Sequence, residues 1–408
     1  MNILIFNDYA CIQGGAAQVA IASAKGLADA GYNVHYIYAV GPAAEELYHP
    51  NIKLLDLRQY DLLSHPSKAK AAVVGVWNTQ VSELLNDFLE GFEPQDTVAH
   101  FHTWVKSLTS SAVVAVRKKN IPIVLTLHDY FTACPNGGFY NYNASSVCKL
   151  DAMSIACLGS NCDSRSYAQK LWRFARQIVT NKSGVPSAIT DFIYVSHFSL
   201  EILKQYLPTN SSYWHIPNPI DIEKQSQAKP SESDVFTYIG RFSPEKGAQL
   251  FALAAQNLGI RARFVGGGEL IQQLQEINPT AEFTGWLNRD AIPKVVRNSR
   301  AIVFPSYLYE TQGMVVAEAA ALGIPCIVSD ACAGKDYIID GKTGILFESG
   351  DVSALEDAIV KIANSPELAD QMGQASYTSY WEKPPTLERH VSDLVNCYNA
   401  ILARNYTE

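Results

Sequence analysis

The chain has 408 residues, of which 48% are hydrophobic and 18% charged, and its formal net charge at pH 7 is −8. That length exceeds what one hydrophobic core commonly supports, so we expect two domains in a globular protein. Residues 1–215 carry 16 Lys and Arg against 16 Asp and Glu, so the whole excess of acid lies in residues 216–408. An acidic chain without a long basic stripe argues against nucleic acid as a partner.

The N-terminal segment MNILIFNDYACIQGG has no Lys or Arg before its apolar run. The run is also too short for a secretory signal peptide. No window of the sequence is apolar over the length that a bilayer requires. We therefore expect a cytoplasmic protein.

Short apolar runs alternate with helix-like segments through the first half of the chain. Residues 2–6 (NILIF) and 34–40 (VHYIYAV) are predicted strands, and the helix between them closes at Gly31. Further strands are predicted in TVAHFHTW, IPIVLTLHDY and AITDFIYVS, each beside a helical stretch. Strands that alternate with helices indicate parallel α/β layers.

Residues 207–234 interrupt this alternation with a stretch rich in Pro, Ser, Asn and Lys, which is typical of a domain boundary. The alternation then resumes from FTYIGR to TGILF. The predicted fold class is α/β, with two doubly wound Rossmann-like domains over residues 1–215 and 216–384. Such sheets bind ligands at the carboxyl ends of their strands, so we expect a site in the cleft between the domains. An amphipathic helix within residues 385–408 is expected to cross back to the first domain.

The segment YIGRFSPEKG places Arg241 and Lys246 on a turn between a predicted strand and a predicted helix. Two cations beside the free N–H groups of a helix N-terminus suit a diphosphate. Taken alone, the turn is better explained as a solvated basic surface.

The stretch YETQGMVVAEAAALGIP contains two acids, Glu310 and Glu318, in an otherwise apolar run. On one continuous helix, the two acids would lie about 80° apart. Gly313 favours a loop, whereas VVAEAAALG is a strong helix that ends at Gly323. We therefore expect Glu310 in the loop and Glu318 in the second helical turn, where both would accept hydrogen bonds from paired hydroxyls. The alternatives are an exposed loop acid and an acid that complements the helix dipole.

Several motifs follow one another along the second half: GR-x4-KG, FVGGGEL, FTGW, FPS-x3-E-x7-E-A-x3-G-x-P and GKTGILF. In this order they resemble the retaining glycosyltransferases of family 4, which adopt the two-domain GT-B fold. The first half agrees, with a Gly-Gly turn after the first strand, LHD at 127–129 and IPNPID at 216–221. Pro219 departs from the family, where many members have Gly.

The resemblance implies a role for each matching residue. Arg241 and Lys246 would bind the donor diphosphate, and Glu318 would hold the ribose. Glu310 would contact the transferred sugar, and His128 would reach that sugar near the reacting carbon. The implied catalytic residues are Arg241, Lys246, Glu310 and His128. The other implied donor-binding residues are Gly14, Gly15, Gly267, Trp286, Leu287, Gln312, Gly313 and Met314.

The last three of these would offer backbone amides to the donor. Trp286 would lie near the base, and a core position explains it equally well. On the acceptor side we expect His102, Asp129 and Asn136.

The implied function is a retaining transfer of a hexose from a nucleotide-diphosphate sugar to a hydroxyl of a glycan or lipid-linked glycan, as in bacterial surface polysaccharide synthesis. UDP is preferred over GDP. No Asp-Xaa-Asp occurs in the chain, so no cofactor is expected for catalysis, and Arg241 with Lys246 would replace a metal ion. The alternatives are another GT-B enzyme, such as a sugar-nucleotide epimerase, and a non-catalytic subunit that binds the nucleotide sugar.

Four of the eight cysteines fall in one long polar segment over residues 128–165, which we expect to shape the acceptor side: Cys134, Cys148, Cys157 and Cys162. A segment of this length with little periodicity needs something to order it. Four thiolates suit a structural zinc ion or an iron–sulfur cluster, although paired Cys-Xaa-Xaa-Cys knuckles are missing. Free thiols in a packed loop explain the segment equally well, and disulfides fit poorly in a cytoplasmic protein.

The next segment, SYAQKLWRFARQIVTNKSG, combines cations with aromatic residues: Lys170, Arg173, Arg176, Lys182, Trp172 and Phe174. A basic, aromatic amphipathic helix would dock on anionic lipid, which predicts peripheral contact with the inner membrane face. A solvated helix face is the more common explanation of such a pattern.

Overall fold

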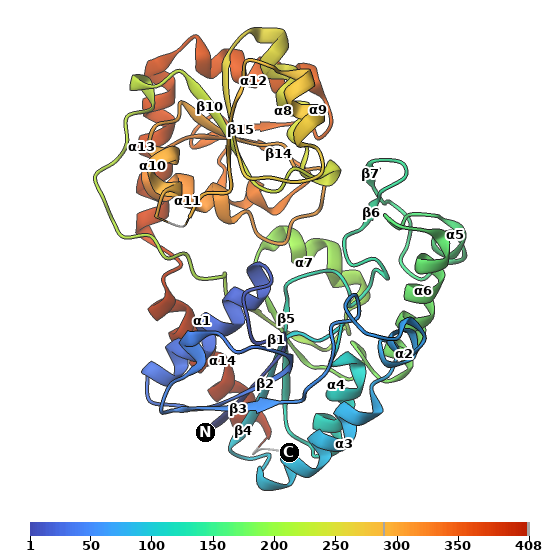
Figure 1. Cartoon of the computed structure of the whole chain (residues 1–408). Helices are drawn as coiled ribbons and strands as arrows, with labels where there is room; N and C mark the ends of the chain where they lie inside the picture. The colour runs from blue at the N-terminus through green and yellow to red at the C-terminus, as the bar shows by residue number, and fades with distance from the viewer. Residues whose placement is uncertain (289, 406–408) are drawn as a thin grey trace.

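The computed structural model describes residues 1–288 and 290–405, which form two α/β domains (Figure 1). The elements of the first domain, with η for a 3-10 helix, are β1 (Asn2–Tyr9), α1 (Gly15–Asp29), β2 (Asn33–Val40), η1 (Glu45–Leu47), β3 (Ile52–Asp56), α2 (Lys68–Val74), α3 (Thr79–Phe88), η2 (Leu89–Gly91), β4 (Thr97–Thr103), α4 (Thr109–Lys118), β5 (Ile123–Leu127), β6 (Tyr140–Asn141), β7 (Ser146–Val147), α5 (Ile155–Gly159), α6 (Tyr167–Lys182), β8 (Asp191–Tyr194), α7 (His197–Leu203), η3 (Lys204–Tyr206) and β9 (Ser212–His215).

The remaining elements are η4 (Pro230–Glu232), β10 (Val235–Ile239), η5 (Pro244–Lys246), α8 (Ala248–Leu258), β11 (Arg261–Val265), α9 (Ile271–Ile277), β12 (Glu282–Gly285), α10 (Ile292–Arg297), β13 (Ala301–Phe304), α11 (Met314–Leu322), β14 (Cys326–Ser329), η6 (Ala333–Tyr337), β15 (Gly344–Phe347), α12 (Val352–Ala363), α13 (Pro366–Glu382) and α14 (Leu387–Asn405).

Each domain is built on a parallel sheet. Within the described residues the strand orders are β3-β2-β1-β4-β5-β8-β9 and β12-β11-β10-β13-β14-β15. Both orders reverse beside the first strand of the domain, which is the doubly wound arrangement. Helices cover both faces of the sheets, so strands such as β1 are buried almost throughout. The predicted α/β class with two doubly wound domains is confirmed.

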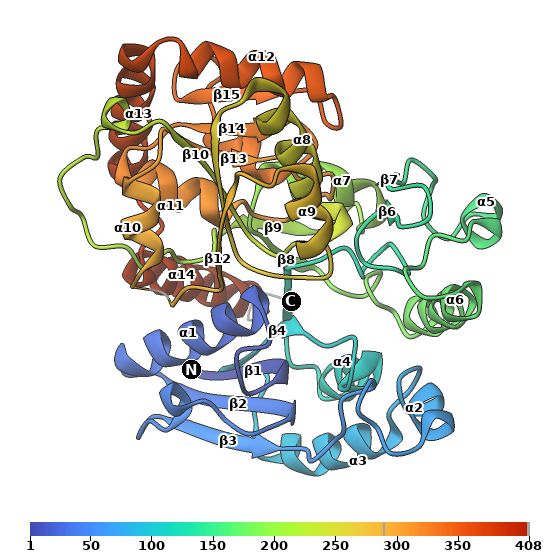
Figure 2. The ribbon, with the colours of Figure 1, turned by 45° about the horizontal axis from the view of Figure 1, so that its top comes forward.

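The last helix, α14, leaves the second domain and lies beside α1 of the first (Figures 1 and 2). Leu394 and Tyr398 join the apolar cluster that contains Ile3. The helices approach closely at Gly26, where an added Cβ would lie 2.6 Å from a methyl group of Val391. Among the described helices, α14 included, none has both the length and the apolar character needed to cross a membrane.

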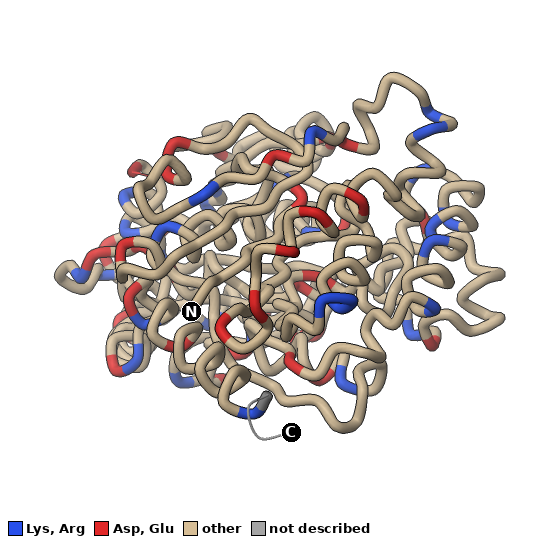
Figure 3. The backbone as a smooth tube through the Cα atoms, turned by 90° about the horizontal axis from the view of Figure 1, so that it is seen from below, with Lys and Arg blue, Asp and Glu red and all other residues tan. Residues whose placement is uncertain are grey.

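The basic helix predicted after the cysteine segment is α6, but three of its six predicted basic or aromatic side chains face the domain. Lys170, Phe174 and Arg176 are buried, and the Arg176 guanidinium lies over the ring of Trp172 at 5.3 Å. These three side chains anchor the helix to the domain, whereas Lys182 is exposed. The predicted basic, aromatic outer face is therefore present only in part, and its contact with a membrane stays a prediction. In Figure 3 this side of the molecule, at the right, still shows more Lys and Arg than Asp and Glu.

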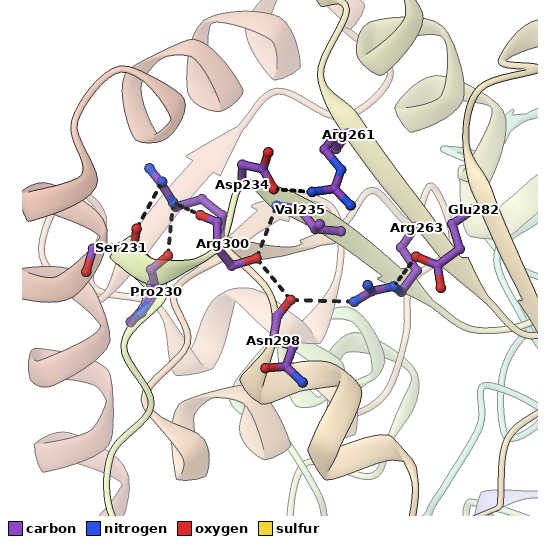
Figure 4. A network of polar contacts seen from close by, with 10 residues as sticks. Pro230, Ser231, Asp234, Val235, Arg261, Arg263, Glu282, Asn298 and Arg300 are labelled. Carbon is purple, nitrogen blue, oxygen red and sulfur yellow. Dashed lines mark hydrogen bonds and ion pairs between the residues drawn. The ribbon is translucent and has the colours of Figure 1, made fainter.

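A buried arginine joins the interdomain linker to the second sheet (Figure 4). Arg300 donates through Nε to the carbonyl oxygens of Pro230 at 3.0 Å and Ser233 at 2.6 Å. Its backbone N–H donates to the carbonyl of Val235 at 2.7 Å. The same edge carries two ion pairs, Asp234–Arg261 at 2.8 Å and Glu282–Arg263 at 2.7 Å. Together they hold the start of the second domain against β11, β12 and β13.

Candidate active site

A cavity of about 330 Å³ lies between the two domains, at the carboxyl ends of their central strands. The first domain contributes Gly15 at the start of α1 and His128, which follows β5. The second contributes Arg241 after β10 and Glu310 after β13. Loops gather at this edge because all strands of a parallel sheet end there.

An ion pair lies in the second-domain wall of the cavity. Lys246 Nζ is 2.5 Å from Oε1 of Glu310, with the two side chains 22% and 14% exposed. The hydroxyl of Ser306 donates to the same carboxylate oxygen at 3.2 Å. Glu310 occupies the loop before α11, as predicted from the sequence. Arg241 is exposed and lines the same cavity, so two cations and one acid are available to a ligand.

Lys246 is held in place by the glycine that follows it. Gly247 has φ of +70°, a left-handed conformation that ends η5 and begins α8. A Cβ at this position would lie 2.0 Å from the carbonyl oxygen of Pro305. Only glycine therefore lets the cationic turn approach the end of β13 this closely.

The N-terminus of α11 lies in the wall of the cavity. The side chain of Gln312 is buried: its Oε1 accepts from the N–H of Asn218 at 2.8 Å and its Nε2 lies 2.9 Å from the hydroxyl of Tyr337. The amide of Met314 donates to the carbonyl of Gln312 at 3.1 Å. Met314 and Gln312 both line the cavity, and the roles of the amides of Gln312, Gly313 and Met314 as anion donors stay predictions.

Glu318 lies in the second turn of α11, as predicted, and is half-buried. Its carboxylate is near enough to Tyr380 of α13 to contribute, after burial, to the raised pKa of that phenol. It is not among the residues that line the cavity. Its predicted contact with a ribose stays a prediction.

On the first domain, the glycine turn after β1 opens onto the cavity. Gly14 has φ of +131° and is the N-cap of α1, so the turn needs glycine at this position. An added Cβ at Gly14 or Gly15 would meet nothing within 4 Å, which leaves the backbone open to a ligand.

His128 lines the cavity and is tied to both domains. The hydroxyl of Thr311, in the second domain, donates to the His128 carbonyl at 2.9 Å. The His128 ring pairs with His102 of β4, with Nε2 and Nδ1 2.9 Å apart. Burial lowers the pKa of His128 to about 3, so the ring is neutral at pH 7.

The three residues expected on the acceptor side do not line the cavity. His102 is 3% exposed and lies behind His128. The amide nitrogen of Asn136 lies 3.1 Å from Sγ of Cys162, within the cysteine segment. Asp129 accepts from the N–H of its near neighbour Phe131 at 3.0 Å, and burial raises its pKa to about 6. His102 thus supports the wall of the cavity from β4, and Asp129 and Asn136 make contacts within the loop that follows β5.

The residues predicted near the base lie apart from the cavity lining. Trp286 is 69% exposed, which excludes a core position. Its indole covers Gly267, where an added Cβ would lie 2.9 Å from Nε1. Leu287 follows it and is half-buried. The half-buried Gly267 and the exposed Trp286 thus lie side by side near the end of β11.

The predicted cysteine segment is organised around a buried lysine. Lys170 is fully buried, its Nζ is 3.2 Å from Sγ of Cys157, and it also interacts electrostatically with Cys162 and Cys134. Burial raises the pKa of Cys134 and Cys162. All four thiols of the segment are free. Within residues 1–288 and 290–405, no three His, Cys, Asp or Glu side chains are arranged to hold a metal ion. The zinc or iron–sulfur site stays a prediction that metal analysis would test.

Some polar side chains of the cavity were not singled out from the sequence. Ser306 and Asn218 both line it, in the quoted motifs FPS and IPNPID. The motifs marked the right segments. Which side chains meet there depends on contacts between distant parts of the chain.

Two family models match the chain. Residues 13–224 match the family described as Glycosyltransferase Family 4, and residues 219–379 match the one described as Glycosyl transferases group 1. The UDP-Gal:alpha-D-GlcNAc-diphosphoundecaprenol alpha-1,3-galactosyltransferase of Escherichia coli is 30% identical over 179 residues, which cover 38% of this chain and 46% of the relative. The GDP-mannose-dependent alpha-mannosyltransferase of Mycolicibacterium smegmatis is 31% identical over 144 residues, 35% of this chain and 37% of the relative. The matches thus span less than half the length of these relatives.

Solved structures resemble the chain along nearly its whole length. The sucrose-phosphate synthase of Thermosynechococcus elongatus is 17% identical with a TM-score of 0.73, covering 99% of each chain. The Anabaena protein HepE in complex with UDP is 15% identical with a TM-score of 0.70, covering 98% of this chain and 100% of that one. At these identities the likeness shows the fold, and it confirms the predicted GT-B architecture.

Proposed function

Because the chain belongs to glycosyltransferase family 4, we propose that it moves a hexose, with retention, from a nucleotide-diphosphate sugar to a hydroxyl of a glycan or lipid-linked glycan. The observation that carries this proposal is the interdomain cavity in which Arg241, Lys246 and Glu310 lie opposite His128. A diphosphate needs cations and a sugar needs hydrogen-bonding acids, and one cavity offers both. UDP is the proposed carrier, supported by one relative named for UDP-Gal and by neighbours solved with UDP or UDP-glucose.

In this proposal Arg241 and Lys246 neutralise the diphosphate without a metal ion. Lys246 is already paired with Glu310 at 2.5 Å, so diphosphate binding shares or replaces that pair. Glu310 then holds a hydroxyl of the hexose, and Glu318 holds the ribose. The neutral His128 contributes a hydrogen bond from the opposite domain.

The transfer step breaks the bond between the sugar C1 and the diphosphate oxygen, and the bonding electrons leave with the phosphate. The acceptor oxygen forms the new bond to C1 on the same face, and its proton passes to the departing phosphate oxygen. The charge that develops on that phosphate is stabilised by cations already in place, which is the largest contribution that a preorganised site makes.

A nucleotide screen tests the donor assignment. UDP, GDP and ADP are added in excess and the melting temperature is measured; a ligand at one hundred times its Kd stabilises the native state by roughly 2.7 kcal/mol. We expect UDP to give the largest shift and Arg241→Ala to reduce it. If no nucleotide shifts the melting temperature, the proposed donor class is wrong.

Two alternatives remain distinguishable by product. A sugar-nucleotide epimerase would change the sugar while it stays attached to the nucleotide, and a non-catalytic subunit would bind UDP without releasing it from UDP-sugar. Mass spectrometry of the sugar nucleotide, with and without glycan acceptors, separates these outcomes from transfer.

We also propose that the acceptor is lipid-linked and that the first domain contacts the cytoplasmic face of an anionic bilayer. The relative from Escherichia coli is named for a diphosphoundecaprenol acceptor. In this chain, Ile155 of α5 is 90% exposed, and Leu171 and Ile178 of α6 are exposed as well. The exposed cations of the same region are Lys149, Arg165 and Lys182. Exposed apolar side chains combined with exposed cations suit an anionic lipid surface.

Flotation with anionic liposomes tests the membrane contact. The wild-type protein should float with the vesicles, and the double substitution Ile155→Ser and Leu171→Ser should weaken this. Val360→Ser, which changes an exposed apolar residue of α12, is the matched control. Absence of the wild-type protein from the floated fraction would contradict the proposal.

A further inference from the structure

A row of three histidines runs from the cavity wall into the first domain. His128 lines the cavity, and its ring meets that of His102 edge to edge, with ring planes 20° apart, centroids 5.1 Å apart and Nε2 of His128 2.9 Å from Nδ1 of His102. The other nitrogen of His102, Nε2, is buried without a hydrogen-bond partner among the described residues. His100, two residues earlier on β4, has each ring nitrogen within 2.6 Å of a hydroxyl, from Tyr398 and Thr126.

Both rings of the His102–His128 pair are neutral at pH 7. Burial lowers the pKa of His102 well below its ordinary value and that of His128 to about 3. A neutral imidazole carries one N–H, so one ring of the pair donates and the other accepts. If His102 donates through Nδ1 to Nε2 of His128, the buried Nε2 of His102 carries only a lone pair. His128 then carries its proton on Nδ1. If His128 donates instead, His102 buries an N–H with no acceptor.

The first arrangement is favoured for two reasons. A buried N–H without an acceptor is rarer in folded proteins than an unsatisfied acceptor. In addition, Nδ1 is the ring nitrogen of His128 that remains for a ligand, and an N–H there attracts an anionic nucleotide sugar whereas a lone pair repels it.

We therefore propose that His102 is a positioning residue for the transfer reaction. It does not touch the substrate. Its Nδ1–H holds His128 as the Nδ1–H tautomer, so that His128 acts as a hydrogen-bond donor to an oxygen of the donor substrate and not as a base. The identity of that oxygen rests on the proposed function, but the tautomer does not.

Substitutions of His102 separate positioning from packing. His102→Asn keeps an N–H near the place of Nδ1, His102→Leu removes it, and His102→Asp offers acceptors alone. We expect His102→Leu to lower kcat/KM on the order of tenfold to a hundredfold, less than the loss of a direct transition-state donor. His102→Asn should recover most of this loss. Melting temperatures identify any variant that fails to fold.

The pH profile is a readout that a packing role would not change. A carboxylate at position 102 would draw the proton of His128 onto Nε2 and raise the pKa of that ring. The activity of His102→Asp should then increase as the pH falls, because protonation restores an N–H on Nδ1. The wild-type profile should show no such increase between pH 8 and pH 6, since the pKa of His128 is about 3.

Nitrogen NMR tests the tautomer without any substrate. In protein labelled with ¹⁵N at histidine, the signals of His128 are assigned by their loss in His128→Phe. A protonated Nδ1 and a bare Nε2 are expected, and the opposite pattern would overturn the proposal even in an inactive protein. Wild-type kcat/KM in folded His102→Leu, or equal losses in His102→Leu and His102→Asn, would overturn it as well. If no donor is turned over, the proposed function fails while the NMR result still decides the tautomer.

Discussion

Replacement of Glu310 by Gln tests the centre of the candidate site. The substitution keeps the shape of the side chain and an oxygen for the hydroxyl of Ser306, which lies 3.2 Å away. It removes the charge that pairs with Lys246 at 2.5 Å. In the proposed mechanism the same carboxylate holds the transferred hexose, so stability and transfer should respond differently.

The expected loss of stability is moderate. Two unit charges about 4 Å apart interact by about 4 kcal/mol at an effective dielectric constant of 20, and the desolvation of both groups offsets much of this. With 22% and 14% of the side chains exposed, the pair lies between an exposed one and a fully buried one. We therefore expect Glu310→Gln to lower the free energy of unfolding by about 1–3 kcal/mol.

Transfer should fall much further than stability. We expect a decrease in kcat on the order of a hundredfold or more, because an interaction with the reacting sugar is lost. UDP affinity should be unchanged or higher, since Lys246 no longer has a competing carboxylate. The measurements are urea unfolding, UDP titration and UDP release from UDP-sugar with acceptor.

The matched control is Glu282→Gln, which removes the acid of a 2.7 Å pair with Arg263 at the outer edge of the second sheet. It should cost no more than about 1 kcal/mol and leave transfer unchanged. Wild-type transfer in Glu310→Gln would refute the assignment. A loss of UDP binding that equals the loss of transfer would also refute it, because Glu310 would then only order the diphosphate site.

Three further outcomes follow from the structure. Gly247→Ala should lower the free energy of unfolding by more than about 2 kcal/mol, because φ is +70° and the new Cβ would lie 2.0 Å from a backbone carbonyl oxygen. The control is Gly259→Ala, where φ is +64° and an added Cβ would meet nothing within 4 Å. In the same urea unfolding, this control should cost only about 1 kcal/mol. Thr311→Val removes the 2.9 Å hydrogen bond to the His128 carbonyl across the cleft. It should raise the donor KM about twofold to tenfold without lowering the melting temperature of either domain. An unchanged KM would argue against a role of this bond in holding the two domains together around the donor. Burial raises the pKa of Asp129 from 3.8 to about 6, so its charge destabilises the native state above pH 6, and this penalty is lost as the pH falls towards 4. Asp129→Asn should therefore raise the free energy of unfolding at pH 8 by up to roughly 3 kcal/mol and leave it unchanged at pH 3. Equal effects at pH 8 and pH 3 would contradict this prediction.

Much of the fold was predictable because its signals are local. The alternation of short apolar runs with helical segments predicted two parallel-sheet domains, and the resemblance of the motifs to glycosyltransferase family 4 implied the GT-B architecture. The separation of Glu310 from Glu318 was also predictable, because Gly313 and Gly323 mark the two ends of α11. Such features depend on neighbours along the chain, which the sequence displays directly.

The direction of the α6 faces was not predictable in the same way. An amphipathic pattern normally places cations in water, yet Lys170 is buried beside the Cys157 thiol and Arg176 donates to the carbonyl of Pro135 at 3.3 Å. These partners belong to the long segment before the helix, which has little periodicity. A buried cation is acceptable only where such partners exist, and periodicity does not identify them.

Sequence alone determined the chemical types at the strand ends: cations after β10, an acid after β13 and histidines on β4 and after β5. Tertiary structure decided which of them meet. His102 and His128 are 26 residues apart, but β4 and β5 are neighbouring parallel strands, with Phe101 opposite Leu125. Lys246 and Glu310 are 64 residues apart and meet because β10 and β13 are adjacent. Strand order brings distant residues together through hydrogen bonds between backbone groups. These groups are nearly the same in every residue. The side chains of a strand therefore do not by themselves specify which strand pairs with it.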